Sequence, residues 1–301
     1  MSLAADGVLV VDKPSGPTSH DVVAVARRAL GTAKVGHTGT LDPMATGVLV
    51  LVVGRATRLA RYMAGDVKTY DAQITFGRAT DTYDALGATT LDSGRQPQPA
   101  ALLAALSGFT GPLQQTPPAY SAKKVGGEAA YKLARRDAPV HLAPVPVVVH
   151  ALTLGHYANG VATLTVRASA GFYVRSLAHD LGMLLGTGAH LSALLRTRAG
   201  AFALADAVPW EVLAAGGDAA RAGLLPIDRL LPDLPGVVLS PDDVARARHG
   251  QTVQAPVALE AQAGPIRLVD EAARLIGIAE VKAPAPALPA PVTLQPVVIL
   301  G

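Results

Sequence analysis

Residues 36–47 of this chain read Gly36-His37-Thr38-Gly39-Thr40-Leu41-Asp42-Pro43-Met44-Ala45-Thr46-Gly47. The segment contains one carboxylate, Asp42, among small, turn-forming and apolar residues, and its nearest acidic neighbours in the sequence are Asp21 and Asp66. A carboxylate without a second acid nearby suits nucleophilic attack better than one half of an acid–base pair. An aspartate before a proline is also common in ordinary turns, and spacing alone favours that simpler interpretation.

The segment resembles the catalytic loop of the TruB family of bacterial tRNA pseudouridine synthases, whose pattern is G-H-T-G-x-L-D-P-x-A-T-G. Every specified position of the pattern is matched. Further family-like segments follow in the expected order across residues 7–200, whereas the C-terminal part resembles the family only loosely. These segments are residues 10–14, 68–70, 80–87, 117–124, 171–175 and 186–191.

The resemblance implies an enzyme that isomerises uridine 55 in the T loop of tRNAs to pseudouridine. It implies that Asp42 is the nucleophile and that Arg175 keeps this carboxylate ionised, because burial alone would favour its neutral form. Tyr70 is expected to stack on the uracil, a contact worth ~1–3 kcal/mol. Tyr173 is expected to lie near C5 of the base and to help remove its proton. Without the resemblance, each tyrosine would be interpreted as a core or half-buried strand residue.

The expected substrate also assigns roles to residues outside the chemistry. A uridine in a structured T loop is stacked, so that the enzyme must flip it out. The resemblance implies that His37 fills the vacated space, that Lys13 supports the catalytic loop and that Leu195 forms an apolar wall of the uracil pocket. On local sequence alone, a capping or core histidine is an equally good interpretation of His37.

Residues 120–137 resemble the RNA-gripping insertion of the family. Glu128 and Ala129 stand where relatives usually carry basic or amide residues, which weakens the expected RNA contact but not the chemistry. A solvated basic helix face is the alternative interpretation. The basic side chains of the segment are Lys123, Lys124, Lys132, Arg135 and Arg136.

Composition limits the class of protein. Hydrophobic residues make up 50% and charged residues 16% of the chain, which indicates a globular protein. The absence of cysteine excludes disulfides and thiolate metal sites, and the expected reaction requires neither metal nor cofactor. No signal-peptide pattern and no apolar run long enough to cross a membrane is present. We therefore expect a cytoplasmic protein, a monomer in the absence of any interface signature.

Charge is unevenly distributed along the chain. Residues 1–231 carry 21 Lys and Arg against 16 Asp and Glu, whereas residues 232–301 carry 5 against 7. A tRNA partner would therefore be held mainly by the first part. The net charge of +5 in that part is ordinary for its size, so this indication is weak.

Hydrophobic patterning predicts an α+β protein. Its catalytic domain, with a mixed or antiparallel sheet, is expected over residues 1–230. A small β-rich module is expected over residues 236–301, where the family usually has an RNA-binding PUA domain. Strands are predicted at 7–11, 48–53, 70–76, 145–154 and 160–169. Helices are predicted at 20–30, with Ser19 as cap, and at 58–64, 99–106, 127–136, 174–185 and 191–195.

Two other classes of enzyme, nucleotide hydrolases and metal phosphohydrolases with His-Asp pairs, match parts of the sequence. Residues 31–38 approach the phosphate-binding pattern G-x-x-x-x-G-K-[ST], but His37 replaces the lysine and a helix precedes the loop, so a nucleotide hydrolase is rejected. The His-Asp pairs at 20–21 and 179–180 lack further ligands for a metal.

Two alternatives remain close to the expected enzyme. A tRNA-binding RNA chaperone without essential catalysis would keep the basic surface and lose the catalytic loop, whereas here the loop is intact. The guide-RNA-dependent relatives of archaea and eukaryotes are disfavoured by the insertion at 120–137, so that no guide RNA is expected.

Overall fold

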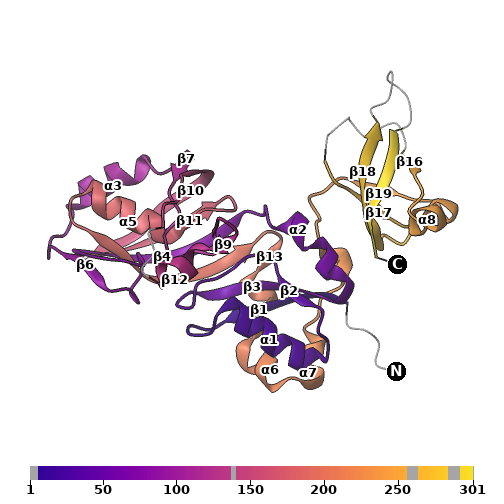
Figure 1. The fold of residues 1–301 in the computed structure, drawn as a ribbon, viewed down its shortest axis with the longest axis horizontal. Helices are drawn as coiled ribbons and strands as arrows, with labels where there is room; N and C mark the ends of the chain where they lie inside the picture. Colours follow the sequence, from indigo (N-terminus) through magenta and orange to yellow (C-terminus); the bar gives the residue numbers. More distant parts are fainter. Residues whose placement is uncertain (1–5, 137–139, 256–263, 284–291, 301) are drawn as a thin grey trace.

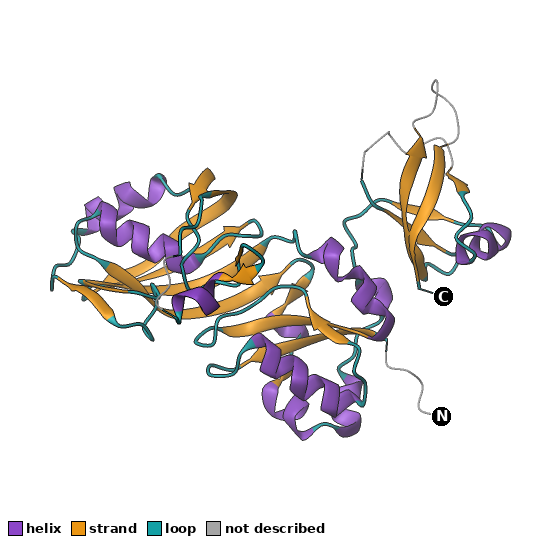
Figure 2. Cartoon of the chain, in the orientation of Figure 1, coloured by secondary structure: helices purple, strands orange, loops and turns teal. Residues whose placement is uncertain are grey.

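The structure is a computed structural model that describes residues 6–136, 140–255, 264–283 and 292–300. Figure 1 shows a large part that carries most of the helices and strands, followed by a smaller β-rich part at the C-terminal end. Helices pack against sheet in both parts (Figure 2). The predicted α+β fold class is confirmed.

A ten-stranded sheet forms the large part. The β1–β14 and β3–β12 pairs are parallel, and the remaining pairs are antiparallel, so the sheet is mixed. The short strands β2 (Val35–His37) and β13 (Phe202–Ala203) pair with β3 and β12. Along its main path the order is β14 (Val208–Pro209), β1 (Gly7–Lys13), β3 (Thr46–Val53), β12 (Ala189–Ala199), β4 (Lys68–Phe76), β11 (Val161–Ala168), β10 (Val145–Ala158) and β7 (Gly111–Gln115).

Strand β3 is buried on both faces, as its continuous apolar sequence predicts. Leu49, Leu51 and Val53 belong to one core, together with residues of α1 (Ser19–Leu30), α6 (Trp210–Ala215) and α7 (Gly217–Ala222). Val48, Val50 and Val52 belong to a second core on the opposite face, with residues of η1 (Gly54–Leu59) and α2 (Ala60–Met63). This double burial holds the start of β3 firmly, and the residues just before it form the segment quoted above.

Helices also cover the other half of the sheet. Helix α5 (Val174–Leu184) packs on β12 and β4, and α3 (Pro99–Ser107) packs on α5 and β10. The apolar residues Leu177 and Leu181 of α5 lie in the same core as Leu102 and Leu106 of α3. The N-terminal end of α5 therefore lies close to the centre of the sheet.

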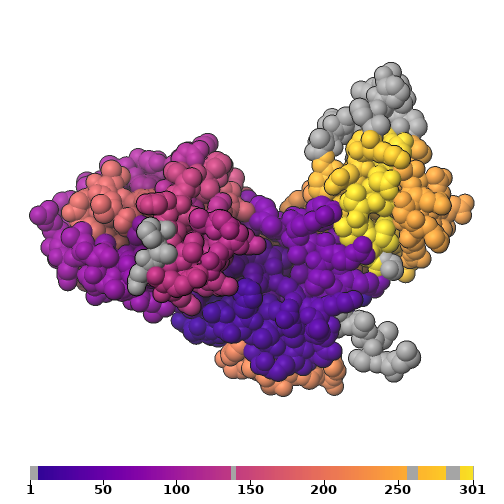
Figure 3. All heavy atoms as spheres, in the orientation of Figure 1, coloured from indigo at the N-terminus to yellow at the C-terminus, as the bar shows by residue number. Residues whose placement is uncertain are grey.

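The C-terminal part is built on a five-stranded sheet. Its residues Leu275, Ile278 and Val298 join the second core of the large part, and Arg55 and Arg58 donate hydrogen bonds to backbone carbonyls near the end of the chain. Figure 3 shows this part seated against the segment that precedes α2. Its elements are β15 (Gly236–Val238), α8 (Pro241–Arg248), β16 (Val253–Ala255), β17 (Ile266–Val269), β18 (Leu275–Ala283) and β19 (Val292–Ile299).

Most of the predicted elements are present with shifted ends, but two predictions are wrong. Residues 191–195, predicted as a helix, lie in β12, because the run Leu191, Leu194, Leu195 fits either period and pairing with β4 decides it. The predicted helix at 127–136 is reduced to α4 (Ala130–Ala134). The residues before it form a hairpin of β8 (Lys124–Val125) and β9 (Glu128–Ala129), turned through two glycines with positive φ.

Helix α1 ends at the predicted residue and begins one residue earlier than predicted. Gly31, predicted to end α1, takes the left-handed conformation at its C-cap. The N-cap is Thr18, which forms a capping box with Asp21, and not Ser19 as predicted. No helix in the described ranges has the length and apolar character needed to cross a membrane.

Candidate active site

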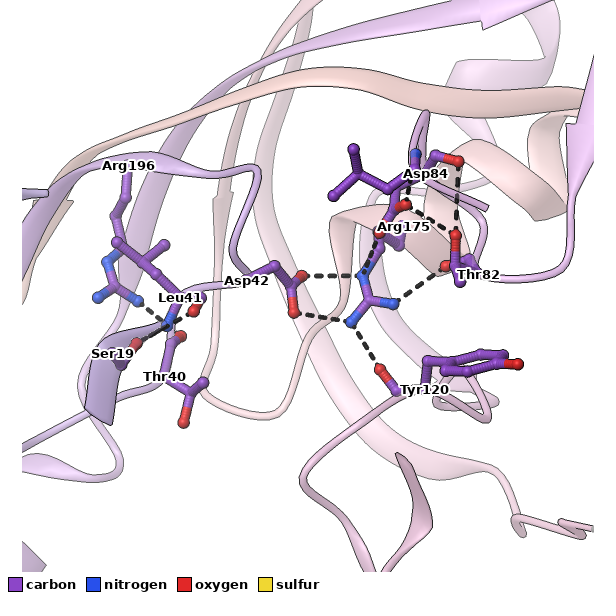
Figure 4. Close-up of polar contacts among 10 residues, drawn as sticks. Ser19, Thr40, Leu41, Asp42, Thr82, Asp84, Tyr120, Arg175 and Arg196 are labelled. Atoms are coloured by element: carbon purple, nitrogen blue, oxygen red, sulfur yellow. Dashed lines mark hydrogen bonds and ion pairs between the residues drawn. The ribbon is translucent and has the colours of Figure 1, made fainter. Parts of the chain in front are cut away.

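Asp42 lies in the loop between β2 and β3 and faces Arg175, the second residue of α5 (Figure 4). Arg175 Nε donates to Asp42 Oδ2 and Arg175 Nη2 donates to Asp42 Oδ1, each at 2.8 Å. The Asp42 side chain is 30% exposed, whereas that of Arg175 is 4% exposed. A bidentate, charge-assisted pair of this kind fixes the orientation of the carboxylate and leaves it open to a substrate.

The remaining donors of the Arg175 guanidinium are also bound. Nη1 donates to the carbonyl of Thr82 and Nη2 also donates to the carbonyl of Tyr120, both at 3.0 Å. A second carboxylate, the buried Asp84, lies 3.8 Å from Nε and accepts hydrogen bonds from the Thr82 hydroxyl and the Leu86 backbone. The guanidinium therefore cannot turn away from Asp42 without losing contacts to two other segments, residues 82–84 and Tyr120.

The side chains of Ser19 and Lys13 bond the backbone of the loop that contains Asp42. The Ser19 hydroxyl donates to the carbonyl of Leu41 and accepts from its N–H, so that Ser19 fixes the residue before Asp42. Lys13 is fully buried and donates to the carbonyls of Pro14, Pro43 and Ala45. Burial lowers the pKa of Lys13 to about 8, although the Asp42 charge opposes the shift. Lys13 therefore bonds backbone carbonyls on the C-terminal side of Asp42.

Arg196 is a residue of this site that the sequence analysis missed. It lies on β12, is 2% exposed, and donates to the carbonyls of Val48, Thr40 and Gly39, which belong to both ends of the Asp42 loop. Burial lowers the pKa of Arg196, and the neighbouring Tyr70 and Asp42 oppose that shift. The available signal was an arginine directly after the apolar residues 193–195, and the helical interpretation of 191–195 obscured it.

Gly47 brings β3 and β12 together at the end of the same loop. Its φ is +93°, and a Cβ at this position would lie 2.4 Å from the carbonyl oxygen of Arg196 and 2.7 Å from Leu195 Cδ1. Neither the backbone conformation nor the space admits a side chain. Leu195 itself is half-buried and pairs with Thr46, beside the loop.

We expect Gly47→Ala to lower the free energy of unfolding by about 3 kcal/mol or more, since overpacking is added to left-handed strain. Gly111→Ala is the matched control: Gly111 has the same φ of +93°, but nothing lies within 4 Å of its added Cβ. The control should lose only the conformational part, about 1–2 kcal/mol. Urea unfolding of both variants measures the difference, and equal losses would show that the close approach to Arg196 is unimportant.

Of the two predicted tyrosines, Tyr173 lies near the Asp42–Arg175 pair and Tyr70 lies beside Arg196. Tyr70 is half-buried on β4 and is paired in register with Arg196 on β12. Tyr173 is the N-cap residue of α5, directly before Val174 and Arg175. Burial raises the pKa of Tyr173; the Ser121 hydroxyl opposes the rise and the Asp42 charge adds to it. The structure thus assembles Tyr70, Tyr173, Arg175 and Asp42 from three distant segments.

His37, at the end of β2, meets His20 of α1 edge to face, with ring centroids 5.4 Å apart. The His37 Nδ1 atom is buried and has no hydrogen-bond partner in the described part of the chain. Burial lowers the pKa of His37, and the charges of His20 and Arg196 add to this effect. His37 is therefore held neutral near physiological pH.

We expect the free energy of unfolding of the wild type to fall more than that of His37→Gln between about pH 7 and about pH 5. The unfolded chain takes up the His37 proton near its ordinary pKa of 6.5, whereas the folded protein takes it up only at lower pH. Below about pH 6.5 the unfolded state therefore binds more protons, and acid favours it. Urea titrations over this range measure the effect; parallel curves for both proteins would contradict the prediction.

The first residue of the basic segment 120–137, Tyr120, contacts the site through its carbonyl. Lys123 and Lys124 are exposed and lie three and four residues after Tyr120, whose carbonyl accepts from Arg175. Arg136 forms an ion pair with Glu128, which reduces the positive charge available to a partner. Asp137, which belongs to the same sequence segment, lies outside the described residues. No group of three or more His, Asp or Glu side chains within the described ranges is arranged to hold a metal ion.

Three family models match the chain in succession. The model "TruB family pseudouridylate synthase (N terminal domain)" matches residues 27–174, and "tRNA pseudouridylate synthase B C-terminal domain" matches residues 175–232. "Pseudouridine synthase II TruB, C-terminal" matches residues 235–286. Together they cover more than half of the chain, including Asp42 and Arg175.

Curated relatives agree with these models. A "tRNA pseudouridine synthase B" of Symbiobacterium thermophilum is 51% identical over 249 residues, covering 81% of this chain and 82% of the relative. One from Solibacter usitatus is 43% identical over 283 residues, covering 93% of this chain and 97% of the relative. Among solved structures, a Cbf5-Nop10-Gar1 complex contains a chain with a TM-score of 0.78 and 23% identity, covering 99% of this chain and 85% of the other. The latter likeness concerns the fold.

Proposed function

Since the chain belongs to the TruB family of pseudouridylate synthases, we propose that it is a tRNA pseudouridine synthase that converts uridine 55 of the T loop into pseudouridine. The observation that carries this proposal is the bidentate contact between Arg175 and Asp42 in a loop that matches the family pattern. An ionised, oriented and partly exposed carboxylate is what a nucleophile requires.

The reaction exchanges one bond of the uracil ring for another. The bond between N1 and C1′ of the ribose breaks, the base turns, C5 bonds to C1′, N1 gains a proton and C5 loses one. Asp42 is the nucleophile that permits the first bond to break, and Arg175 holds it in its ionised, aligned form. Tyr70 stacks on the base while it turns, and Tyr173 helps to remove the C5 proton, since its phenol lies near Asp42 and Arg175.

Substrate binding divides between the two parts of the chain. The flipped uridine enters beside Asp42, with Leu195 as an apolar wall, while His37 fills the space left in the T loop. Lys123 and Lys124 bind the RNA backbone from the insertion. Residues 1–230 form the catalytic domain, and residues 236–301 form a PUA-like RNA-binding module. The shared core between the two supports a fixed rather than a freely moving module.

The enzyme acts as a monomer, in the cytoplasm and without a guide RNA. The basic segment that follows Tyr120 belongs to this chain and reaches its own active site, so that no second molecule is needed to bring RNA to Asp42. This proposal is tested by assaying the purified protein alone on a tRNA transcript; a requirement for added RNA would contradict it.

Tritium release from tRNA labelled at uridine C5 tests the function directly. The wild type is expected to release one tritium per tRNA, because the C5 proton is lost when the new bond is formed. A transcript with cytidine at position 55 is the control and should release none. If the protein binds tRNA tightly but releases no tritium, the alternative of an RNA chaperone without essential catalysis replaces this proposal.

A further inference from the structure

A buried glutamine holds the backbone of Tyr173. Gln115, the last residue of β7, is 4% exposed. Its Oε1 accepts a hydrogen bond of 2.8 Å from the Tyr173 N–H, and its Nε2 donates one of 3.0 Å to the Tyr173 carbonyl. The side-chain amide has one acceptor atom and one donor atom, and here both bond a single residue that is distant in the sequence.

On the N-terminal side of Tyr173, Phe172 is buried in the core and its N–H donates to the carbonyl of Ser169. No side chain of the N-cap residue bonds the first turn of α5, and Gly171, two residues before Tyr173, has a positive φ with nothing within 4 Å of its would-be side chain. The Tyr173 carbonyl also accepts from the Leu177 N–H, which ties the residue to the helix but not to the sheet. Gln115 therefore ties both backbone polar groups of Tyr173 to β7, an edge strand of the sheet.

The same stretch of chain is attached to α5 at two further points. The Ser176 hydroxyl donates to the carbonyl of Thr116, and Arg175 donates to that of Tyr120. Residues 115, 116 and 120 thus bond Tyr173, Ser176 and Arg175, so that residues 115–120 lie against the start of α5. Only the Gln115 contact acts on the residue whose phenol approaches Asp42.

We propose that Gln115 is a positioning residue for the isomerisation, which keeps the Tyr173 phenol aligned with the reacting base. This inference rests on the proposed function. Without the amide, the half-buried Tyr173 loses the acceptor of its N–H and the donor to its carbonyl, and the segment before α5 is free to shift. A displacement of about 1 Å in an active-site group can cost about 100-fold in rate.

Gln115→Met tests the proposal, because methionine keeps the length of the side chain and removes both hydrogen bonds. Gln114→Met is the matched control, since Gln114 is the neighbouring residue on β7 and is exposed. Single-turnover tritium release at saturating enzyme should slow by about 10- to 100-fold in Gln115→Met. The Kd for tRNA should remain within about twofold, and Gln114→Met should match the wild type in both measurements.

A double-mutant cycle with Tyr173→Phe separates positioning from a general loss of structure. If Gln115 acts through Tyr173, the substitution Gln115→Met slows the Tyr173→Phe enzyme much less than it slows the wild type. Single-turnover reactions followed for hours keep these slow variants measurable. If the rate of the double variant is lowered by the product of the two single-variant factors, the proposal is wrong.

Gln115→Glu provides a second variant should Gln115→Met fail to fold. It keeps an acceptor for the Tyr173 N–H and loses the donor to the Tyr173 carbonyl, so its rate should fall below that of the wild type. A folded Gln115→Met or Gln115→Glu enzyme with the wild-type rate refutes this proposal alone. A wild type that releases no tritium refutes the proposed function as well.

Discussion

Asp42→Asn abolishes tritium release from C5-labelled tRNA, with an expected loss of about 10⁴-fold or more and tRNA binding close to that of the wild type. Asparagine has nearly the shape of aspartate but is not a nucleophile. Its amide group also presents a donor to Arg175 in place of one of the two acceptors now used. Because the Asp42 side chain is 30% exposed, the variant should fold.

The control for this experiment is Asp21→Asn, the same chemical change at an exposed carboxylate of the α1 capping box. It should retain the wild-type rate. Tritium release and filter binding are measured on all three proteins. An Asp42→Asn enzyme within about tenfold of the wild type would exclude Asp42 as the nucleophile.

Arg175→Lys is expected to lower kcat by about 100- to 1000-fold with little change in KM. The guanidinium now bonds both oxygens of Asp42 and the carbonyls of Thr82 and Tyr120. A lysine has one nitrogen and cannot reproduce this planar, four-way contact. The Asp42 carboxylate would then lose its fixed orientation beside Asp84, because the positive charge, although kept, would be concentrated on one nitrogen.

Removal of the charge should have a different consequence. Arg175→Met leaves two carboxylates around a buried apolar side chain and should lower the free energy of unfolding by about 3–5 kcal/mol. Steady-state kinetics and urea unfolding of both variants separate the effect of orienting Asp42 from the effect of the Arg175 charge. Arg28→Lys, on the exposed face of α1, is the control and should behave as the wild type. A fully active Arg175→Lys enzyme would show that the bidentate geometry is dispensable.

The sequence alone determined the class of protein and the centre of its site. The apolar run at 48–53 predicted a strand buried on both faces, and Gly31 predicted the end of α1, because each signal depends on neighbours within a few residues. The loop at 36–47 identified the family through a pattern that is local as well. Asp42 could therefore be selected before any contact was known.

Only the tertiary structure decided what surrounds Asp42. Arg175 lies 133 residues further along the chain, and their bidentate contact depends on how α5 packs on the sheet. Arg196 was missed because residues 191–195 fit a helical period equally well, and pairing with β4 made them a strand. Gln115 gave no local signal, since its two partners are backbone atoms of a residue 58 positions away. Local periodicity reports which face of an element is buried, whereas side-chain hydrogen bonds between distant segments exist only once the sheet has brought those segments together.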